Sequence, residues 1–147
     1  LLAAIAQEGF ELLAANMDRI HAETLGQPEY ERLLTLSSGY VSFAVEHPHH
    51  FQLMFGPLDQ SKHPALFEAS MAALGKLIEA VAEAQAHGVV REGPPPLLAT
   101  TLWYTIHGIA SVWIARKIPP NMLEDASPEE FARPHVENVL NGLAAST

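Results

Sequence analysis

The sequence lacks cysteine and contains few basic residues. Without cysteine, its 147 residues can form no disulfide and offer no thiol for catalysis or metal binding. Eight lysines and arginines stand against 17 aspartates and glutamates, which gives a formal net charge of -9. Arg116-Lys117 is the one place where two basic residues are adjacent. Because binding to phosphate backbones requires clustered Lys and Arg, we expect that this stretch of 147 residues does not bind DNA by itself.

The sequence also shows no strand-like alternation, no internal repeat and no low-complexity segment. No basic segment precedes an apolar one in the manner of a signal peptide. These features and the absence of cysteine suit the cytoplasm, where we expect the protein to reside. The length and the hydrophobic content of 48% fit one compact domain, residues 1–147, with a sizeable core.

Charge is missing altogether from Pro94 to Ala115. A helix that is apolar around its whole circumference must be covered on all sides. The length permits a membrane span, but the threonines, the tyrosine, the histidine and the serine in this segment would be costly in hydrocarbon. We therefore predict a central helix that begins near Pro96 or Leu97, with one side against its own domain and the other against something else.

Apolar residues at three- and four-residue steps predict helices in most of the remaining sequence. Pro and Gly residues and a capping box (Ser127-Pro128-Glu129-Glu130) mark where these helices begin and end. The expected helices run from Leu2 to about Gly26, Glu29 to Glu46, Pro48 to Phe55, Pro64 to Gly88, and onward from Ser127. In the helix that begins at Pro64, the residues expected to face inward are Phe67, Met71, Leu74, Ile78, Val81 and Gln85. The predicted fold is all-α, with six helices of unequal length.

The histidines His47, His49, His50 and His63 lie close together in the sequence. Imidazole is a common metal ligand, but a His-Glu-x-x-His motif is absent and adjacent histidines on a helix point in different directions. We interpret them as polar residues at a solvated helix start. A histidine-dependent metal protein, either sensor or hydrolase, is the alternative hypothesis.

The case for an enzyme is weak, because no Ser-His-acid order, Gly-rich phosphate loop or pair of carboxylates on an apolar face is recognisable. We expect neither catalysis nor a cofactor. His107, within the uncharged helix, has two interpretations. It either contacts a ligand in a buried cavity, or is a core histidine hydrogen-bonded to Tyr, Thr or a backbone carbonyl.

One face of the uncharged helix carries small and polar residues, which allow another helix to approach closely. If the Trp103 side packs on its own core, the Gly108 side needs a partner. A second copy of the last two long helices would complete a four-helix bundle with twofold symmetry. The residues predicted at this dimer interface are Thr101, Tyr104, Gly108, Ser111, Val136, Val139, Leu140 and Leu143.

Three segments resemble the C-terminal regulatory domain of tetracycline-repressor-type (TetR) transcriptional regulators, in the class named for a Trp…His-Gly motif. They are Leu1–Phe10, Glu46–Gly56, and Trp103 with His107-Gly108. The resemblance implies a homodimer and a small-molecule cavity among the earlier helices. It also implies a preceding helix-turn-helix domain, which would carry the contacts with DNA. Leu1 opens directly into a helical pattern without a capping residue, as expected for a chain that such a domain precedes.

Phenylalanine and methionine are concentrated in the first four helices, a composition that suits either a plain core or an adaptable apolar cavity. Our hypothesis is the effector-binding and dimerisation domain of a transcriptional repressor, whose apolar or aromatic ligand shifts the first helix. The residues predicted around the ligand are Phe10, Met17, Phe43, Met54, Phe55, Met71, Trp103 and His107.

Overall fold

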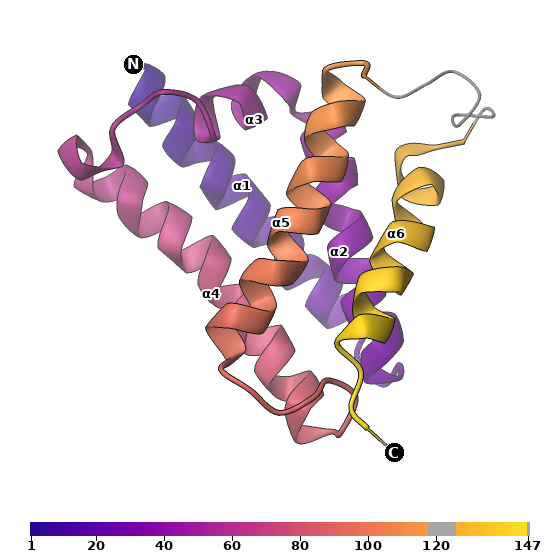
Figure 1. The fold of residues 1–147 in the computed structure, drawn as a ribbon. Helices are drawn as coiled ribbons and strands as arrows, with labels where there is room; N and C mark the ends of the chain where they lie inside the picture. Colours follow the sequence, from indigo (N-terminus) through magenta and orange to yellow (C-terminus); the bar gives the residue numbers. More distant parts are fainter. Residues whose placement is uncertain (118–125, 147) are drawn as a thin grey trace.

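The computed structural model describes residues 1–117 and 126–146, and this part of the chain is all-α (Figure 1). One 3-10 turn lies between the third and fourth helices. The elements are α1 (Leu2–Glu23), α2 (Glu29–Glu46), α3 (Pro48–Met54), η1 (Gln60–Lys62), α4 (Pro64–Ala86), α5 (Pro95–Ile114) and α6 (Pro128–Gly142). The predicted fold class and the six predicted helices are confirmed.

Local signals in the sequence set the helix ends. Gly88 directly follows the cap residue of α4 and has a φ of 74°, and Gly26 in the turn after α1 has a φ of 86°, a left-handed conformation that costs glycine little. At the start of α6, Ser127 Oγ accepts a hydrogen bond from the backbone N of Glu130 (3.1 Å). Glu130 Oε2 in turn accepts one from the backbone N of Ser127 (2.8 Å), which completes the predicted capping box.

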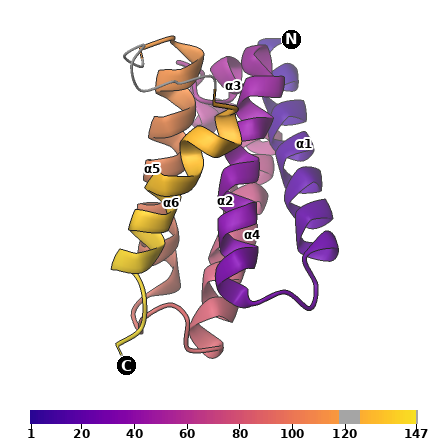
Figure 2. The ribbon, with the colours of Figure 1, turned by 90° about the vertical axis from the view of Figure 1, so that its right-hand side faces the viewer.

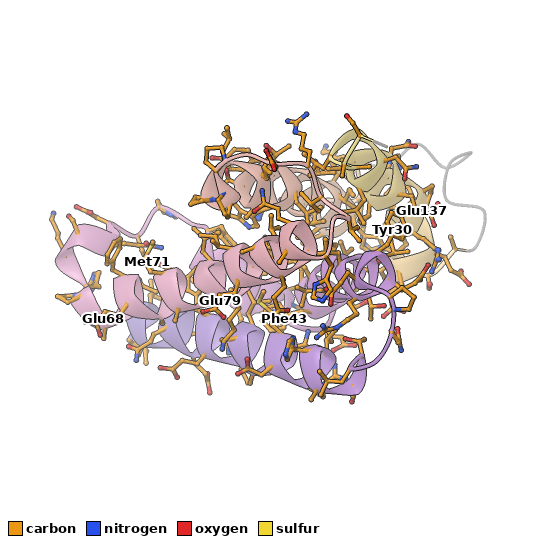
Figure 3. The ribbon with its side chains drawn as sticks, turned by 90° about the horizontal axis from the view of Figure 1, so that it is seen from below. Tyr30, Phe43, Glu68, Met71, Glu79 and Glu137 are labelled. Carbon is orange, nitrogen blue, oxygen red and sulfur yellow. The ribbon has the colours of Figure 1, made fainter. Side chains whose placement is uncertain are left out.

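Helix α2 lies in the middle of the fold and packs against α1, α4, α5 and α6 (Figure 2). Helices α1 and α4 lie along one side of it, and α5 and α6 along the other (Figures 1 and 2). At one end of the α2–α6 contact Tyr30 lies beside Glu137 (Figure 3), and Tyr30 Oη donates a hydrogen bond to Asn141 Oδ1 (3.3 Å). The core therefore lies around α2, and α5 packs against α2, α4 and α6.

By length and composition, α5 is the one described helix that could cross a membrane. In the fold it contributes an apolar face to the core, because Leu98, Leu102 and Ile106 are buried where α5 packs on α2, α4 and α6. The prediction that one side of the uncharged helix packs on its own domain is confirmed.

The predicted inward face of α4 is wrong over its first half. Phe67 and Met71 are 49% and 47% exposed, while Leu66, Ala73 and Leu77 are buried. The buried stripe thus lies beside the predicted one. Spacing alone cannot distinguish them, because α4 is apolar over a wide arc and the packing of α1 and α5 selects the side that is covered. Figure 3 shows Met71 among the side chains along α4, between Glu68 and Glu79.

Candidate functional site

An apolar cavity of about 240 Å³ lies among α1, α2, α4 and α5. All four helices contribute side chains to it, and Phe55 after α3 and Gln60 of η1 complete the wall. Its lining among the described residues contains no charged side chain. The lining residues are Phe10, Leu13, Met17, Leu36, Tyr40, Phe55, Gln60, Ser70, Met71, Ala73, Leu74, Leu77, Trp103 and Ile106.

Five of the eight predicted ligand-binding residues line this cavity. They are Phe10, Met17, Phe55, Met71 and Trp103. They come from α1, the end of α3, α4 and α5, so the fold brings together residues that are far apart in the sequence. Their contact with a ligand stays a prediction.

The other three predicted residues, Phe43, Met54 and His107, do not line the cavity. Phe43 packs on the ring of His47 (centroids 4.9 Å apart) and faces a polar groove between α1, α2 and α6. Met54 is buried against Gly9, where an added Cβ would lie 2.5 Å from the Met54 sulfur. Phe43 therefore belongs to the core beside this groove, Met54 packs α3 against α1, and neither bounds the apolar cavity.

His107 lies directly behind the cavity wall. Its ring stacks on Phe51 (centroids 5.1 Å apart, planes at 29°) and meets the ring of Phe55 edge-on at 4.4 Å. Its Nδ1 is 2.8 Å from the hydroxyl of Tyr40, which does line the cavity. His107 therefore matches the interpretation of a core histidine hydrogen-bonded to a tyrosine, and it reaches the cavity through Tyr40.

The Tyr40 hydroxyl makes hydrogen bonds with two side chains, Trp103 and His107. The indole N–H of Trp103 donates to Tyr40 Oη at 3.2 Å. An indole nitrogen can only donate, so Tyr40 Oη is the acceptor of that bond; with the imidazole proton on Nε2, the hydroxyl hydrogen of Tyr40 is donated to His107 Nδ1. Burial lowers the pKa of His107 and raises the pKa of Tyr40, so both groups are neutral near pH 7.

The cavity opens toward η1 and the first half of α4. Tyr40, Leu77 and Ile106 are buried, whereas Met71 is half exposed and Gln60 and Ser70 are half-buried. At this mouth the single hydroxyl hydrogen of Ser70 has two acceptors within reach, the carbonyl oxygen of Phe67 (2.7 Å) and Gln60 Oε1 (3.2 Å). The polar groups near the opening are therefore neutral amide and hydroxyl groups.

A second, polar pocket of about 150 Å³ lies beside the cavity and shares Met17 and Leu36 with it. Its basic groups already have partners. Arg32 lies 3.1 Å from Glu29 in a largely buried ion pair, and Lys76 lies 2.7 Å from Asp18. The apolar cavity and the pocket with charged lining residues are therefore neighbours, and Met17 and Leu36 line both.

The predicted dimer interface divides into two sets of residues. Thr101, Tyr104 and Gly108 are exposed, and Ser111 and Val139 are half-buried. Their side chains are therefore accessible to a partner. In contrast, Val136, Leu140 and Leu143 are 0%, 3% and 5% exposed.

The assignment of Val136, Leu140 and Leu143 to a dimer contact is corrected by their burial. They lie in the core of their own chain, where α6 packs on α2 and α5. The main apolar stripe of α6 packs in this core, so the outer face of α6 has little apolar surface left.

The predicted histidine group is spread over separate contacts. His50 Nε2 lies 3.0 Å from Glu8 Oε2, and the ring of His47 packs between those of Phe43 and His50. Across the described residues, no three histidine, aspartate or glutamate side chains are placed so that they could hold a metal ion. Nothing in this part of the chain favours the metal-protein alternative.

The family model for the tetracyclin repressor-like C-terminal domain matches residues 33–139. The chain belongs to this family. It is thus the regulatory domain of a TetR-type transcriptional regulator, and membership points to a regulator rather than an enzyme. No curated protein gives a significant match.

Two solved structures resemble this TetR-type domain. A protein with unknown function from Rhodococcus sp. RHA1 is 30% identical, with a TM-score of 0.83; the match covers 97% of this chain and 73% of that one. A bacterial regulatory protein of the tetR family from Rhodococcus RHA1 is 15% identical, with a TM-score of 0.72, and the match covers 99% of this chain and 74% of that one. The second likeness establishes the fold alone.

Sequence reasoning missed several lining residues of this TetR-type domain. Tyr40 is the most important, because its hydroxyl connects the cavity to Trp103 and His107. Gln60 and Ser70 were missed because neither belongs to an apolar stripe. Tyr40 follows Leu36 on α2 by four residues, which places both on one face of the helix. This spacing predicts a face that packs in the core, but it does not predict where the core contains a cavity.

Proposed function

We propose that this TetR-type domain binds a small apolar effector in the cavity, forms a homodimer through the outer face of α5, and transmits ligand binding along α1. The observation that carries the proposal is the cavity itself. Native cores are close-packed, with few voids larger than a water molecule. A space of about 240 Å³ with an uncharged lining is therefore a candidate ligand site.

Transmission would use the three α1 side chains in the cavity wall, Phe10, Leu13 and Met17. A ligand that displaces them changes how α1 packs on α4, its most extensive neighbour. Binding shifts α1 only as far as the ligand's affinity differs between the two arrangements. In the full-length regulator, which we expect to be cytoplasmic, α1 would connect to a DNA-binding domain, the part that contacts the operator.

Dimerisation would use the exposed, uncharged face of α5. Leu97, Tyr104 and Val112 are 61%, 64% and 41% exposed, and Gly108 lies in the same row with open space above it. Exposed apolar residues in a continuous row are a feature of protein interfaces. A second copy would cover this row by packing the same helix against it.

The proposed effector site is tested by thermal-shift measurements on the wild type and two variants with a library of small neutral aromatic compounds. Ala73→Leu fills the cavity, and Ala80→Leu is the matched control, because Ala80 lies on the same helix but lines the polar pocket. Ligands should raise the melting temperature of the wild type and of Ala80→Leu, since binding to the native state stabilises it. They should leave Ala73→Leu unchanged. Equal shifts in all three proteins would place binding outside the cavity.

A further inference from the structure

We propose that the cavity takes a neutral aromatic ligand of one or two rings, whose hydrogen-bond acceptor lies at the mouth and receives an N–H from Gln60. The inference rests on the proposed effector site and specifies its ligand. It makes Gln60 a residue that determines specificity.

The neutrality of the ligand follows from the lining. No charged side chain among the described residues lines the cavity. In the neighbouring polar pocket, Arg32 and Lys76 are already paired with carboxylates. A charged ligand would lose its hydration without gaining a counter-charge, which is strongly unfavourable.

The inner end of the cavity offers no donor hydrogen. With the imidazole proton on Nε2, the hydroxyl of Tyr40 gives its hydrogen to His107 Nδ1 (2.8 Å) while it accepts from Trp103 (3.2 Å). Trp103 Nε1 uses its own hydrogen on Tyr40. A ligand acceptor at this end would thus be buried without a partner, so the ligand's inner end must be apolar or carry a donor.

The mouth, in contrast, offers a donor. The Gln60 carbonyl oxygen lies 3.2 Å from Ser70 Oγ and shares its single hydrogen with the nearer carbonyl of Phe67 (2.7 Å), so the amide nitrogen is the end turned away from Ser70. Its Nε2 has no hydrogen-bond partner among residues 1–117 and 126–146. η1 is itself held by Asp59, whose Oδ1 accepts from the backbone N of Ser61 (3.0 Å). An oriented amide N–H on a fixed turn at the opening selects a carbonyl or similar acceptor.

The size of the cavity limits the ligand. An engineered apolar cavity of about 150 Å³ takes up benzene, whereas sites for drug-sized ligands measure roughly 300–1,000 Å³. At about 240 Å³, this cavity holds more than a benzene ring and less than a drug-sized molecule. One substituted ring or two fused rings fit between these limits.

The test measures dissociation constants by NMR titration with three probes of similar shape: ethylbenzene, acetophenone and benzoate. In the wild type, acetophenone should bind roughly three- to tenfold more tightly than ethylbenzene, because it adds one neutral hydrogen bond. Benzoate should show no saturable binding. Gln60→Met keeps the shape but removes the amide, and Gln60→Glu removes the donor. Both should abolish the preference for acetophenone, and the exposed Gln52→Met is the matched control that keeps it.

The outcomes separate this inference from the function on which it rests. If ethylbenzene and acetophenone bind the wild type equally, or the Gln60 variants keep the preference, Gln60 does not select an acceptor, and the effector site itself still stands. Binding of benzoate as tight as that of acetophenone overturns the neutral ligand. Failure of all three probes to bind overturns the cavity as an effector site together with this inference.

Discussion

The two faces of α5 both lack charged residues but have opposite environments. Its inner face is buried through Leu98, Leu102 and Ile106, whereas its outer face exposes Leu97 and Tyr104. Neither face carries a charge. The hydrophobicity of the helix therefore does not reveal which side its own chain covers, and the difference comes from where α2, α4 and α6 lie.

The contrast supports the proposal that a second copy of the chain covers the outer face. Single exposed apolar residues are common on proteins and need no explanation. A row without charge along a whole helix is different, because charged residues on an exposed side would be favourable in water. The adjacent edge of α6 is more polar, with His135 and Asn138 exposed. A partner would thus contact α5 mainly through its apolar row.

The largest effect should come from the inner face. Leu102→Ala leaves a cavity in the core, because Leu102 is fully buried, and it should lower the free energy of unfolding by about 2–5 kcal/mol. The matched change on the outer face, Leu97→Ala, should cost the monomer no more than about 0.5 kcal/mol. Urea unfolding at low protein concentration measures both, and equal losses would mean that the two faces are equally covered.

An intermediate effect is expected at Gly108. Gly108→Leu meets no atom of its own chain and should stabilise the monomer by up to about 1 kcal/mol, because glycine is a poor helix former. In a closely packed dimer the same side chain would overfill the interface and weaken association by roughly 1–3 kcal/mol. Gly75→Leu on α4, which also meets open space, is the control. Analytical ultracentrifugation measures the association; a monomeric wild type at micromolar concentration would reject the interface.

The sequence predicted the helices well because their ends depend on local chemistry, as at Gly26, Gly88 and Ser127. The site was predicted less completely, because a cavity is a property of several helices together. Phe43 and Met54 are residue types that suit an apolar ligand site, but they pack in the core. Tyr40 was not among the predicted ligand-binding residues, yet it lines the cavity. Which apolar residues leave a space is decided by tertiary packing, which residue spacing does not encode.

The smallest effect concerns His107, which stands at the border of the two faces. Burial lowers its pKa below the ordinary value of 6.5, so on acidification the unfolded chain binds a proton before the folded chain does. The stabilisation is complete above about pH 6.5 and is lost as the pH falls from there through the lowered pKa. Protonated Nδ1 could no longer accept the Tyr40 hydrogen, which gives the loss a structural cause.

Urea unfolding between pH 7.5 and pH 5.0 measures this contribution. His107→Gln keeps an acceptor for Tyr40 but does not titrate, so its stability should fall less over this range than that of the wild type. The exposed His135→Gln on α6 is the matched control and should follow the wild type. A His107→Gln profile identical to that of the wild type would show that the imidazole is equally easy to protonate in both states. The assignment of a neutral His107 in the Trp103–Tyr40–His107 hydrogen bonds would then be wrong.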